Sequence, residues 1–125
     1  MLNDKEAIAN LAVKDLKAAA KFYEGTLGFQ KESEEGEEVI TYRSGDSVFN
    51  VYRSEYAGTN KATAVSWAVG DELEGIARSL RAKGVVFEHY DMPGMTREGD
   101  VHMYGDMKVA WFKDPDGNIL NLINR

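Results

Sequence analysis

The chain has 125 residues, no cysteine and two histidines, and its 21 acidic and 15 basic side chains give a net charge of −6. This length suits one domain, the lack of cysteine excludes disulfides and thiolate metal sites, and the acidic balance opposes binding to nucleic acid or to an anionic membrane. Because no segment resembles a secretory signal or the roughly 20 apolar residues of a membrane span, we expect a cytoplasmic protein.

The first half of the chain predicts one strand, one helix and three further strands. Alternation of apolar and polar residues over 8–13 is typical of a strand with one buried face. Asp15 is placed to cap the helix that follows, which ends near residues 25–28. Strand-like segments then occupy residues 29–32, 39–43 and 48–53.

The second half predicts the same order of elements. A strand over 64–69 precedes a helix, for which Asp71 and Glu74 form an expected capping box and Gly84 an expected left-handed stop. Strand-like segments follow at residues 85–90, 108–113 and 119–123, the last two joined by an Asp-Pro-Asp-Gly turn.

Details of spacing indicate that the two halves are copies of one module. Gly28 follows Val13 by 15 positions, and Gly84 follows Val69 by the same 15. An asparagine also lies among apolar residues near the end of each half, at Asn50 and at Asn121. We therefore expect a single domain, residues 1–125, made of two βαβββ modules that span about 5–53 and 63–125.

Two motifs in this duplicated pattern resemble those of the vicinal oxygen chelate superfamily, which includes glyoxalase I, extradiol dioxygenases, fosfomycin-resistance enzymes and metal-free bleomycin-resistance proteins. The motifs are Phe22-Tyr23-x-x-x-Leu27-Gly28-Phe29 and Asp114-Pro115-Asp116-Gly117-Asn118, and the resemblance covers essentially the whole chain. It implies an α+β fold in which two βαβββ modules form a curled eight-stranded sheet, or cup, with the helices outside. It also implies a homodimer.

Metal-using proteins that the chain resembles carry ligands early in each first strand and within each last strand. The matching positions here are Ile8, Ala64, Asn50 and Asn121. An aliphatic side chain has no lone pair to donate, and a neutral amide is a weak ligand for a transition metal. A shift of the alignment by one or two residues restores no ligand set, so we expect neither a metal nor another cofactor.

The expected cup predicts a ligand-binding surface rather than a metal centre. Its expected residues are Asn10, Asn50, Tyr52, Ser66, His102, Met103, Trp111 and Asn121. Strand alternation places Asn10, Tyr52 and Ser66 on one face, and resemblance to ring-cleaving dioxygenases implies that Trp111 faces the bound molecule. Burial of Trp111 in the core is the alternative.

The segment from 91 to 107 shows no internal periodicity and contains every methionine except the first. Flexible methionine side chains adapt to irregular ligands, so the segment is a candidate lid, and ordinary packing onto the sheet is the alternative. His102 lies in this segment, either as a residue of the cup or as an exposed loop histidine. His89 is expected to pair with Asp91 on one strand face.

These observations favour a metal-free small-molecule-binding protein of the glyoxalase/bleomycin-resistance type, with an unknown small organic ligand. The alternative is an enzyme of the same superfamily, such as a lyase or isomerase, with a non-standard or metal-free site. A third hypothesis is a non-catalytic interaction subunit whose cup is filled by its own side chains. Nucleotide-binding and serine-hydrolase motifs are absent from the sequence.

Overall fold

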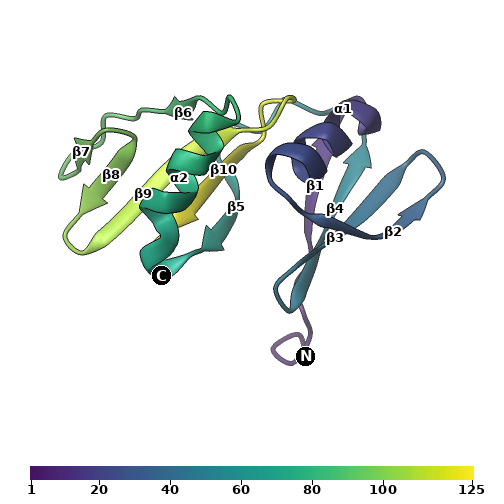
Figure 1. Cartoon of the computed structure of the whole chain (residues 1–125). Helices are drawn as coiled ribbons and strands as arrows, with labels where there is room; N and C mark the ends of the chain where they lie inside the picture. Colours follow the sequence, from purple (N-terminus) through teal and green to yellow (C-terminus); the bar gives the residue numbers. More distant parts are fainter. The chain divides into compact units, whose positions relative to one another are not determined.

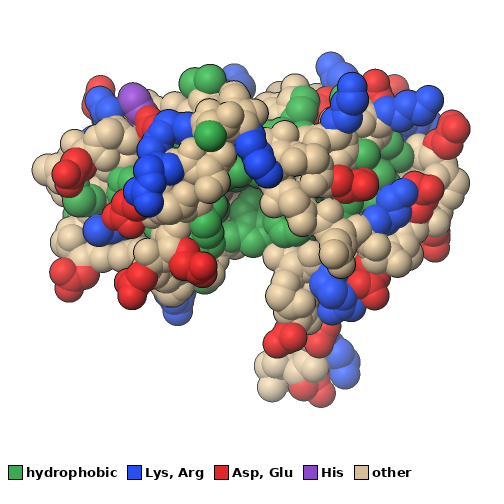
Figure 2. Space-filling model, in the orientation of Figure 1, with side chains coloured by type: hydrophobic (Ala, Val, Ile, Leu, Met, Phe, Trp, Pro, Cys, Tyr) green, Lys and Arg blue, Asp and Glu red, His purple; other side chains and the backbone are tan.

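The computed structural model describes all 125 residues, which divide into two compact units, Met1–Thr59 and Asn60–Arg125 (Figure 1). Each unit contains one sheet with one principal helix, and the order of elements confirms the predicted α+β fold of two βαβββ-type modules. No helix combines the length and the apolar character that crossing a membrane requires. Acidic and basic side chains are intermingled over the visible surface of both units (Figure 2).

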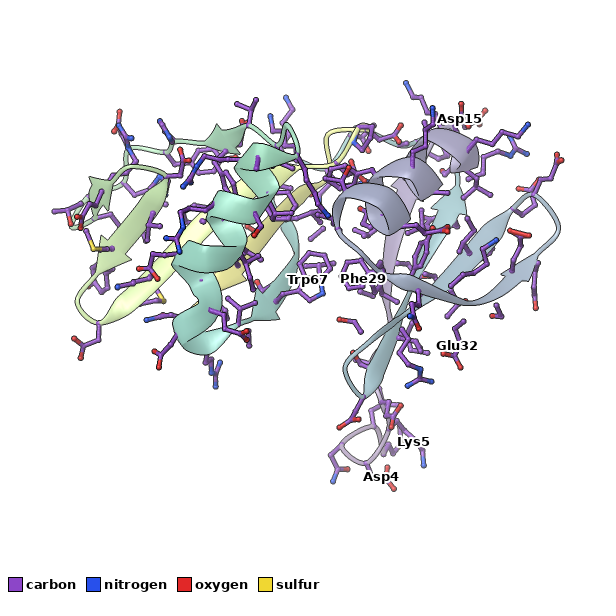
Figure 3. All side chains as sticks on the ribbon, in the orientation of Figure 1. Asp4, Lys5, Asp15, Phe29, Glu32 and Trp67 are labelled. Carbon is purple, nitrogen blue, oxygen red and sulfur yellow. The ribbon has the colours of Figure 1, made fainter.

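The sheet of unit 1 has four strands in the order β1-β4-β3-β2, in which β1 runs parallel to β4 and the other pairs are antiparallel. The strands are β1 (Ala9–Val13), β2 (Gln30–Glu35), β3 (Val39–Ser44) and β4 (Ser47–Arg53). The helix α1 (Leu16–Ala20) continues into the π-helical turn η1 (Lys21–Thr26). Asp15 caps α1 as predicted (Figure 3), because its Oδ1 accepts the N–H groups of Lys17 and Ala18 at 2.8 and 3.3 Å.

Aromatic residues of the first motif form the core of unit 1. The Tyr23 ring lies 5.9 Å from the ring of Tyr42 and 5.9 Å from that of Phe49, and Phe29 lies 5.0 Å from Phe49. The Tyr42 hydroxyl donates to Glu24 Oε2 at 2.8 Å, and burial together with this carboxylate raises the pKa of Tyr42. The motif therefore has a structural role, since it attaches the helix to the sheet.

The sheet of unit 2 has six strands, in the order β5-β10-β9-β8-β7 with β6 also paired to β9. Its strands are β5 (Thr63–Ala68), β6 (Phe87–Glu88), β7 (Thr96–Glu98), β8 (Val101–Tyr104), β9 (Met107–Lys113) and β10 (Ile119–Ile123). A 3₁₀ turn, η2 (Gly70–Glu72), precedes the helix α2 (Leu73–Ala82), which buries Leu73, Ala77 and Leu80. β10 is parallel to β5 and antiparallel to β9.

The edge of β9 is shared by two strands. Phe87 and Glu88 of β6 pair with Phe112 and Trp111, whereas β8 pairs with the preceding half of β9 from Met107 to Val109. The chain therefore leaves this edge after β6, makes an excursion that includes β7, and returns to the same edge as β8.

Within this excursion the structure differs from the sequence prediction. Residues 91–107 do not form one irregular segment, because β7 and β8 make an antiparallel hairpin within it. The ten observed strands replace the expected eight, and they form two sheets. β7 and β8 have three and four residues, too few for alternation to be visible in the sequence. The expected curl of the sheet stays a prediction.

Of the two sequence predictions for the ends of α2, the one for its start is wrong and the one for its end is confirmed. The predicted capping box is wrong, since Asp71 lies in η2 and no side chain caps α2. Glu74 does not reach back to the helix start because its carboxylate binds Lys108 Nζ at 2.9 Å. The predicted stop is confirmed, because Gly84 has a φ of +94° and its N–H donates to the carbonyl of Arg81.

The second motif forms the turn between β9 and β10, as predicted. The buried Asp114 accepts the N–H groups of Asp116 and Asn118 at Oδ1, at 3.0 and 2.8 Å, and the Asn118 side-chain amide at Oδ2. These contacts align β9 with β10, and this alignment fixes the positions of Trp111 and Asn121 described below.

Candidate functional site

Each sheet has one face that carries its helix and a second, helix-free face. On the helix-free face of unit 1, the register aligns Asn10, Asn50 and Thr41 across β1, β4 and β3. On that of unit 2, it aligns Ser66, Asn121 and Trp111 across β5, β10 and β9. Register partners point to the same face, so these two rows occupy equivalent places in the two modules.

The row in unit 1 is satisfied by its own hydrogen bonds. Thr41 Oγ1 donates to Asn50 Oδ1 at 2.7 Å, and Asn50 Nδ2 donates to Asn10 Oδ1 at 3.1 Å. Asn10 Nδ2 in turn donates to the carbonyl of Ile8 at 3.2 Å. Tyr52 lies two residues beyond Asn50 on the same face. The polar groups of this row are therefore already engaged with one another.

The row in unit 2 differs because tryptophan stands where unit 1 has threonine. Trp111 Nε1 donates to Thr63 Oγ1 at 3.1 Å. Asn121 is only 6% exposed, and its Oδ1 is buried without a hydrogen-bond donor. The replacement of the hydroxyl by an indole thus leaves the amide oxygen of Asn121 unpaired.

His102 and Tyr90 lie beside Trp111 on this face. The His102 ring, which is 1% exposed, lies edge-on to the indole at 4.9 Å between centroids, and the Tyr90 ring lies 5.2 Å from the indole. The backbone N–H of Tyr90 donates to His102 Nε2 at 2.9 Å. Because Nε2 accepts, the neutral imidazole carries its proton on Nδ1. Nδ1 has no partner with good hydrogen-bond geometry, although the Val109 backbone lies near enough to offset part of the lowering of the His102 pKa by burial.

We define the aromatic–polar cluster as Tyr90, His102, Trp111 and Asn121. Three buried side-chain polar atoms in the chain lack a hydrogen-bond partner, and all three belong to this cluster: the Tyr90 hydroxyl, His102 Nδ1 and Asn121 Oδ1. An unpaired buried polar group costs about 1–3 kcal/mol. Native proteins rarely keep such groups without a reason, and one such reason is a bound partner.

A cavity of about 440 Å³ adjoins this cluster, within the size range of small-molecule sites. His102 and Tyr90 belong to both the cluster and the cavity wall, and Met92 and Met95 line it from the excursion after β6. The remaining lining residues are Asp91, Pro93, Thr96 and Arg97. Two of the four methionines of the candidate lid therefore line this cavity, whereas Met103 and Met107 do not.

The loop over this cavity has a defined shape. The N–H of Met95 donates to the carbonyl of Met92 at 3.1 Å, which closes a turn. Gly94 within the turn has a φ of +80°, and a Cβ there would lie 3.1 Å from the Tyr104 ring. Glycine is the one residue that adopts this positive φ and leaves room for the Tyr104 ring without strain.

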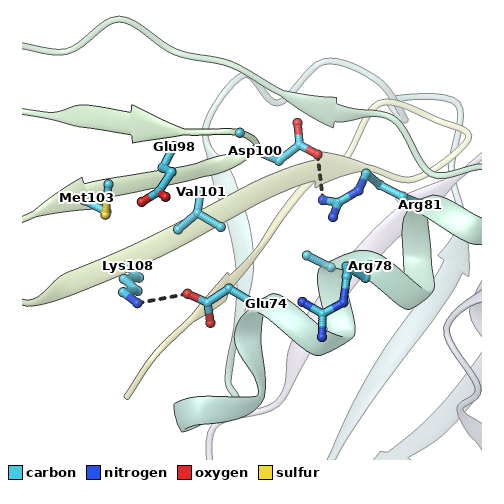
Figure 4. Close-up of a pocket in the computed structure, with 10 residues that line it drawn as sticks. Glu74, Arg78, Arg81, Glu98, Asp100, Val101, Met103 and Lys108 are labelled. Atoms are coloured by element: carbon cyan, nitrogen blue, oxygen red, sulfur yellow. Dashed lines mark hydrogen bonds and ion pairs between the residues drawn. The ribbon is translucent and has the colours of Figure 1, made fainter.

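A larger groove of about 640 Å³ lies between α2 and the β8–β9 region (Figure 4). Four of its charged side chains form two ion pairs: Lys108 Nζ lies 2.9 Å from Glu74 Oε1, and Arg81 Nη1 lies 2.8 Å from Asp100 Oδ2. None of the unpaired buried atoms lies in this groove. It is therefore the weaker candidate for a binding site.

The sequence-predicted site residues are divided between the two units. Asn10, Asn50 and Tyr52 lie in unit 1, whereas Ser66, His102, Trp111 and Asn121 lie in unit 2. Met103 is not brought together with the others, because it points to the face opposite His102 and lines the groove against α2.

Two further findings concern residues at the end of β6. The expected pairing of His89 with Asp91 is wrong, since His89 Nε2 contacts Asp100 Oδ1 at 2.7 Å. The chain turns away from the sheet after Glu88, so strand alternation does not extend to these residues. The sequence does not predict Tyr90 as a site residue, because no local signal distinguishes it from other aromatic residues near the ends of strands.

The model of the Glyoxalase/Bleomycin resistance protein/Dioxygenase superfamily matches residues 7–122. The chain belongs to this superfamily. A comparison with curated protein sequences gives no significant match.

Solved structures of the superfamily are similar over nearly their whole length. A bleomycin-binding protein from Streptomyces verticillus, complexed with copper(II)-bleomycin, is 24% identical, with a TM-score of 0.70 and coverage of 98% of this chain and 97% of that one. A glyoxalase family protein from Enterococcus faecalis is 17% identical, with a TM-score of 0.74 and coverage of 98% and 99%. Lactoylglutathione lyase from Agrobacterium tumefaciens is 14% identical, with a TM-score of 0.69 and coverage of 95% and 92%. At these identities the similarity establishes the fold alone.

The residues of this chain do not fit the metal centre of the metal-using superfamily members. Ile8 is an aliphatic side chain that is 49% exposed, and Asn50 Oδ1 is already engaged by Thr41. No three His, Cys, Asp or Glu side chains lie close enough together to hold a metal ion. The donor chemistry at these positions is therefore that of amides and hydrocarbon, which transition metals bind weakly.

The buried imidazole predicts a pH dependence of stability. Burial lowers the pKa of His102 from its ordinary value of 6.5. Between the lowered and the ordinary pKa, the unfolded chain binds more protons than the folded chain, so the free energy of unfolding falls as the pH drops through this interval. We expect the melting temperature to fall between pH 8 and pH 5 and the His102→Gln variant to lose part of this dependence.

Glutamine suits this test because its side-chain oxygen can still accept the Tyr90 N–H, while the group does not titrate. The matched control is His89→Gln, at the exposed histidine, which should keep the fall seen in the parent chain. Equal pH dependence in the parent chain and the His102→Gln variant would contradict the assignment.

Proposed function

We propose that the chain is a metal-free small-molecule-binding protein of the glyoxalase/bleomycin-resistance type. Its organic ligand binds at the aromatic–polar cluster of unit 2 and in the adjoining cavity. The observation that carries this proposal is the gathering of all three unpaired buried polar atoms around Trp111. A ligand that paired with these atoms would recover the cost of burying them, while the aromatic rings would supply apolar contact.

Relatives of known structure support the proposal that the ligand is a small organic molecule. Two of them are bleomycin-binding proteins in complex with copper(II)-bleomycin or with bleomycin, at 24% and 21% identity. The whole-chain similarity makes a small organic molecule a reasonable occupant here too. We also propose that the two units belong to one domain, residues 1–125, and that the chain forms a homodimer.

The geometry of His102 favours binding over acid–base catalysis. Its Nε2 is occupied by the Tyr90 N–H, and Nδ1 carries the proton of the neutral ring. The ring therefore presents a hydrogen-bond donor rather than a free base. A catalytic role would require this backbone contact to break.

A ligand screen followed by melting temperature and fluorescence tests the proposed function. A ligand that binds the native state stabilises it by about 2.7 kcal/mol at 100 times its dissociation constant. We expect at least one compound of a broad organic library to raise the melting temperature in a saturable way and to change the fluorescence of Trp111.

The chain contains a second tryptophan, Trp67, so the Trp67→Phe variant assigns the fluorescence signal to Trp111. In this variant the ligand-dependent change should persist, whereas Trp111→Phe should weaken the binding. A library without a single saturable response would contradict the proposal.

A further inference from the structure

We infer that the ligand of unit 2 carries a carboxylate, which enters the cavity beside His102 and is bound by hydrogen-bond donors. This inference rests on the proposed function and specifies the chemistry of its ligand. It starts from the polarity of the groups that line the cavity.

Two side chains of the cavity wall can donate hydrogen bonds. His102 lines it, is buried and carries its proton on Nδ1 without an aligned acceptor. The Tyr90 hydroxyl is buried without a partner on the same wall and can donate as well. A ligand group that meets both must therefore offer acceptor oxygens.

The mouth of the cavity adds a positive charge. Arg97 on β7 is the register partner of His102, so its side chain projects from the same face of the adjacent strand. One of its N–H groups donates to the carbonyl of Gly99 at 2.7 Å, and a guanidinium has five such donors. A carboxylate matches this planar set of donors better than a neutral carbonyl does.

One acidic group faces the same cavity. Asp91 is exposed at its rim and would attract a cation or repel an anion. Asp91 and Arg97 are both exposed, so water screens both charges. The preference for an acceptor group therefore rests first on the buried donors of His102 and Tyr90, to which Arg97 adds a direct hydrogen-bonding contact. The apolar remainder of the ligand would lie against Met92, Pro93 and Met95.

Three probes of one shape but different charge test this inference with the full chain: 1-naphthylacetate, 1-naphthylacetamide and 1-naphthylethylammonium. Calorimetric titration gives their affinities, and amide NMR spectra locate the site. We expect the carboxylate to bind about tenfold more tightly than the amide, as one charge-assisted contact would give, and to shift the signals of Met92, Met95 and His102. The ammonium probe should bind least.

Arg97→Gln should reduce the affinity for the carboxylate to about that of the amide and leave the affinity for the amide unchanged. A merely structural role of Arg97 would weaken both. Arg78→Gln is the matched control, because this exposed arginine on α2 lines the other groove and should have no effect. The nitrogen spectrum of His102 should independently show the proton on Nδ1.

Tighter binding of the amide or the ammonium probe at the same residues would overturn this inference and leave the proposed function standing. An ineffective Arg97→Gln substitution, or a proton on Nε2, would also overturn it. If none of the three probes binds, the carboxylate assignment is wrong. The ligand screen with the broad library then tests the proposed function separately.

Discussion

Replacing Tyr23 by alanine is expected to lower the free energy of unfolding by about 3–5 kcal/mol, the usual cost of removing a buried aromatic ring. Tyr23 is 0% exposed, and its ring contacts those of Phe22, Tyr42 and Phe49 at 5.2, 5.9 and 5.9 Å between centroids. No smaller side chain can hold these three rings together, so the substitution leaves a cavity at the junction of the helix and the sheet. Denaturant titration measures the loss.

The same variant tests whether the two units form one domain. Both tryptophans, Trp67 and Trp111, lie in unit 2, whereas Tyr23 lies in unit 1. If the units unfold together, tryptophan fluorescence must report the lower stability of the Tyr23→Ala variant. An unchanged fluorescence midpoint beside a shifted circular dichroism signal would contradict the single domain. Tyr56→Ala, at a side chain that is 73% exposed, is the control and should change stability by less than about 0.5 kcal/mol.

The same substitution at two equivalent asparagines is expected to have opposite effects. Asn50→Leu removes two hydrogen bonds, to Thr41 and Asn10, and should lower the free energy of unfolding by about 1–3 kcal/mol. Asn121→Leu removes a buried oxygen that has no partner and places an apolar group there, so it should raise the free energy of unfolding by about 1 kcal/mol.

Thermal and denaturant unfolding of the two variants, without ligand, measure this difference. Each variant controls for the other, because leucine is introduced at the same place in the two modules. A loss of stability in Asn121→Leu equal to that in Asn50→Leu would mean that Asn121 Oδ1 is satisfied in solution. The unpaired state of this atom, on which the proposed function depends, would then be wrong.

The sequence predicts the elements that depend on local chemistry. The cap at Asp15 and the turn at Asp114 follow from side chains that accept nearby backbone N–H groups, and the stop at Gly84 follows from the positive φ that glycine adopts without strain. All three are confirmed. The two modules were also predictable, since a repeat preserves spacing. The capping box of α2 was not, because Glu74 is drawn to Lys108, which is distant in the sequence.

The candidate site was only partly predictable for the same reason. Alternation within a strand places Asn121 and Trp111 on definite faces, but it does not say which strands are neighbours. His102 and Tyr90 meet Trp111 only because β6 and β8 pair with the same edge of β9. The burial of His102 follows from that long-range arrangement, so the sequence alone could not choose between an exposed and a buried histidine.

Because β6 and β8 pair with the same edge of β9, the segment that lines the cavity is distinct from the strand pairing that keeps the sheet in register. The chain between Glu88 and Val101 begins and ends on one strand, so its length and composition can vary while the hydrogen bonds of β6 and β8 keep their register. The cavity wall contributed by Met92 to Arg97 lies inside this interval. A change of ligand range could thus arise by replacing one short stretch of chain, with the buried face beneath it left intact.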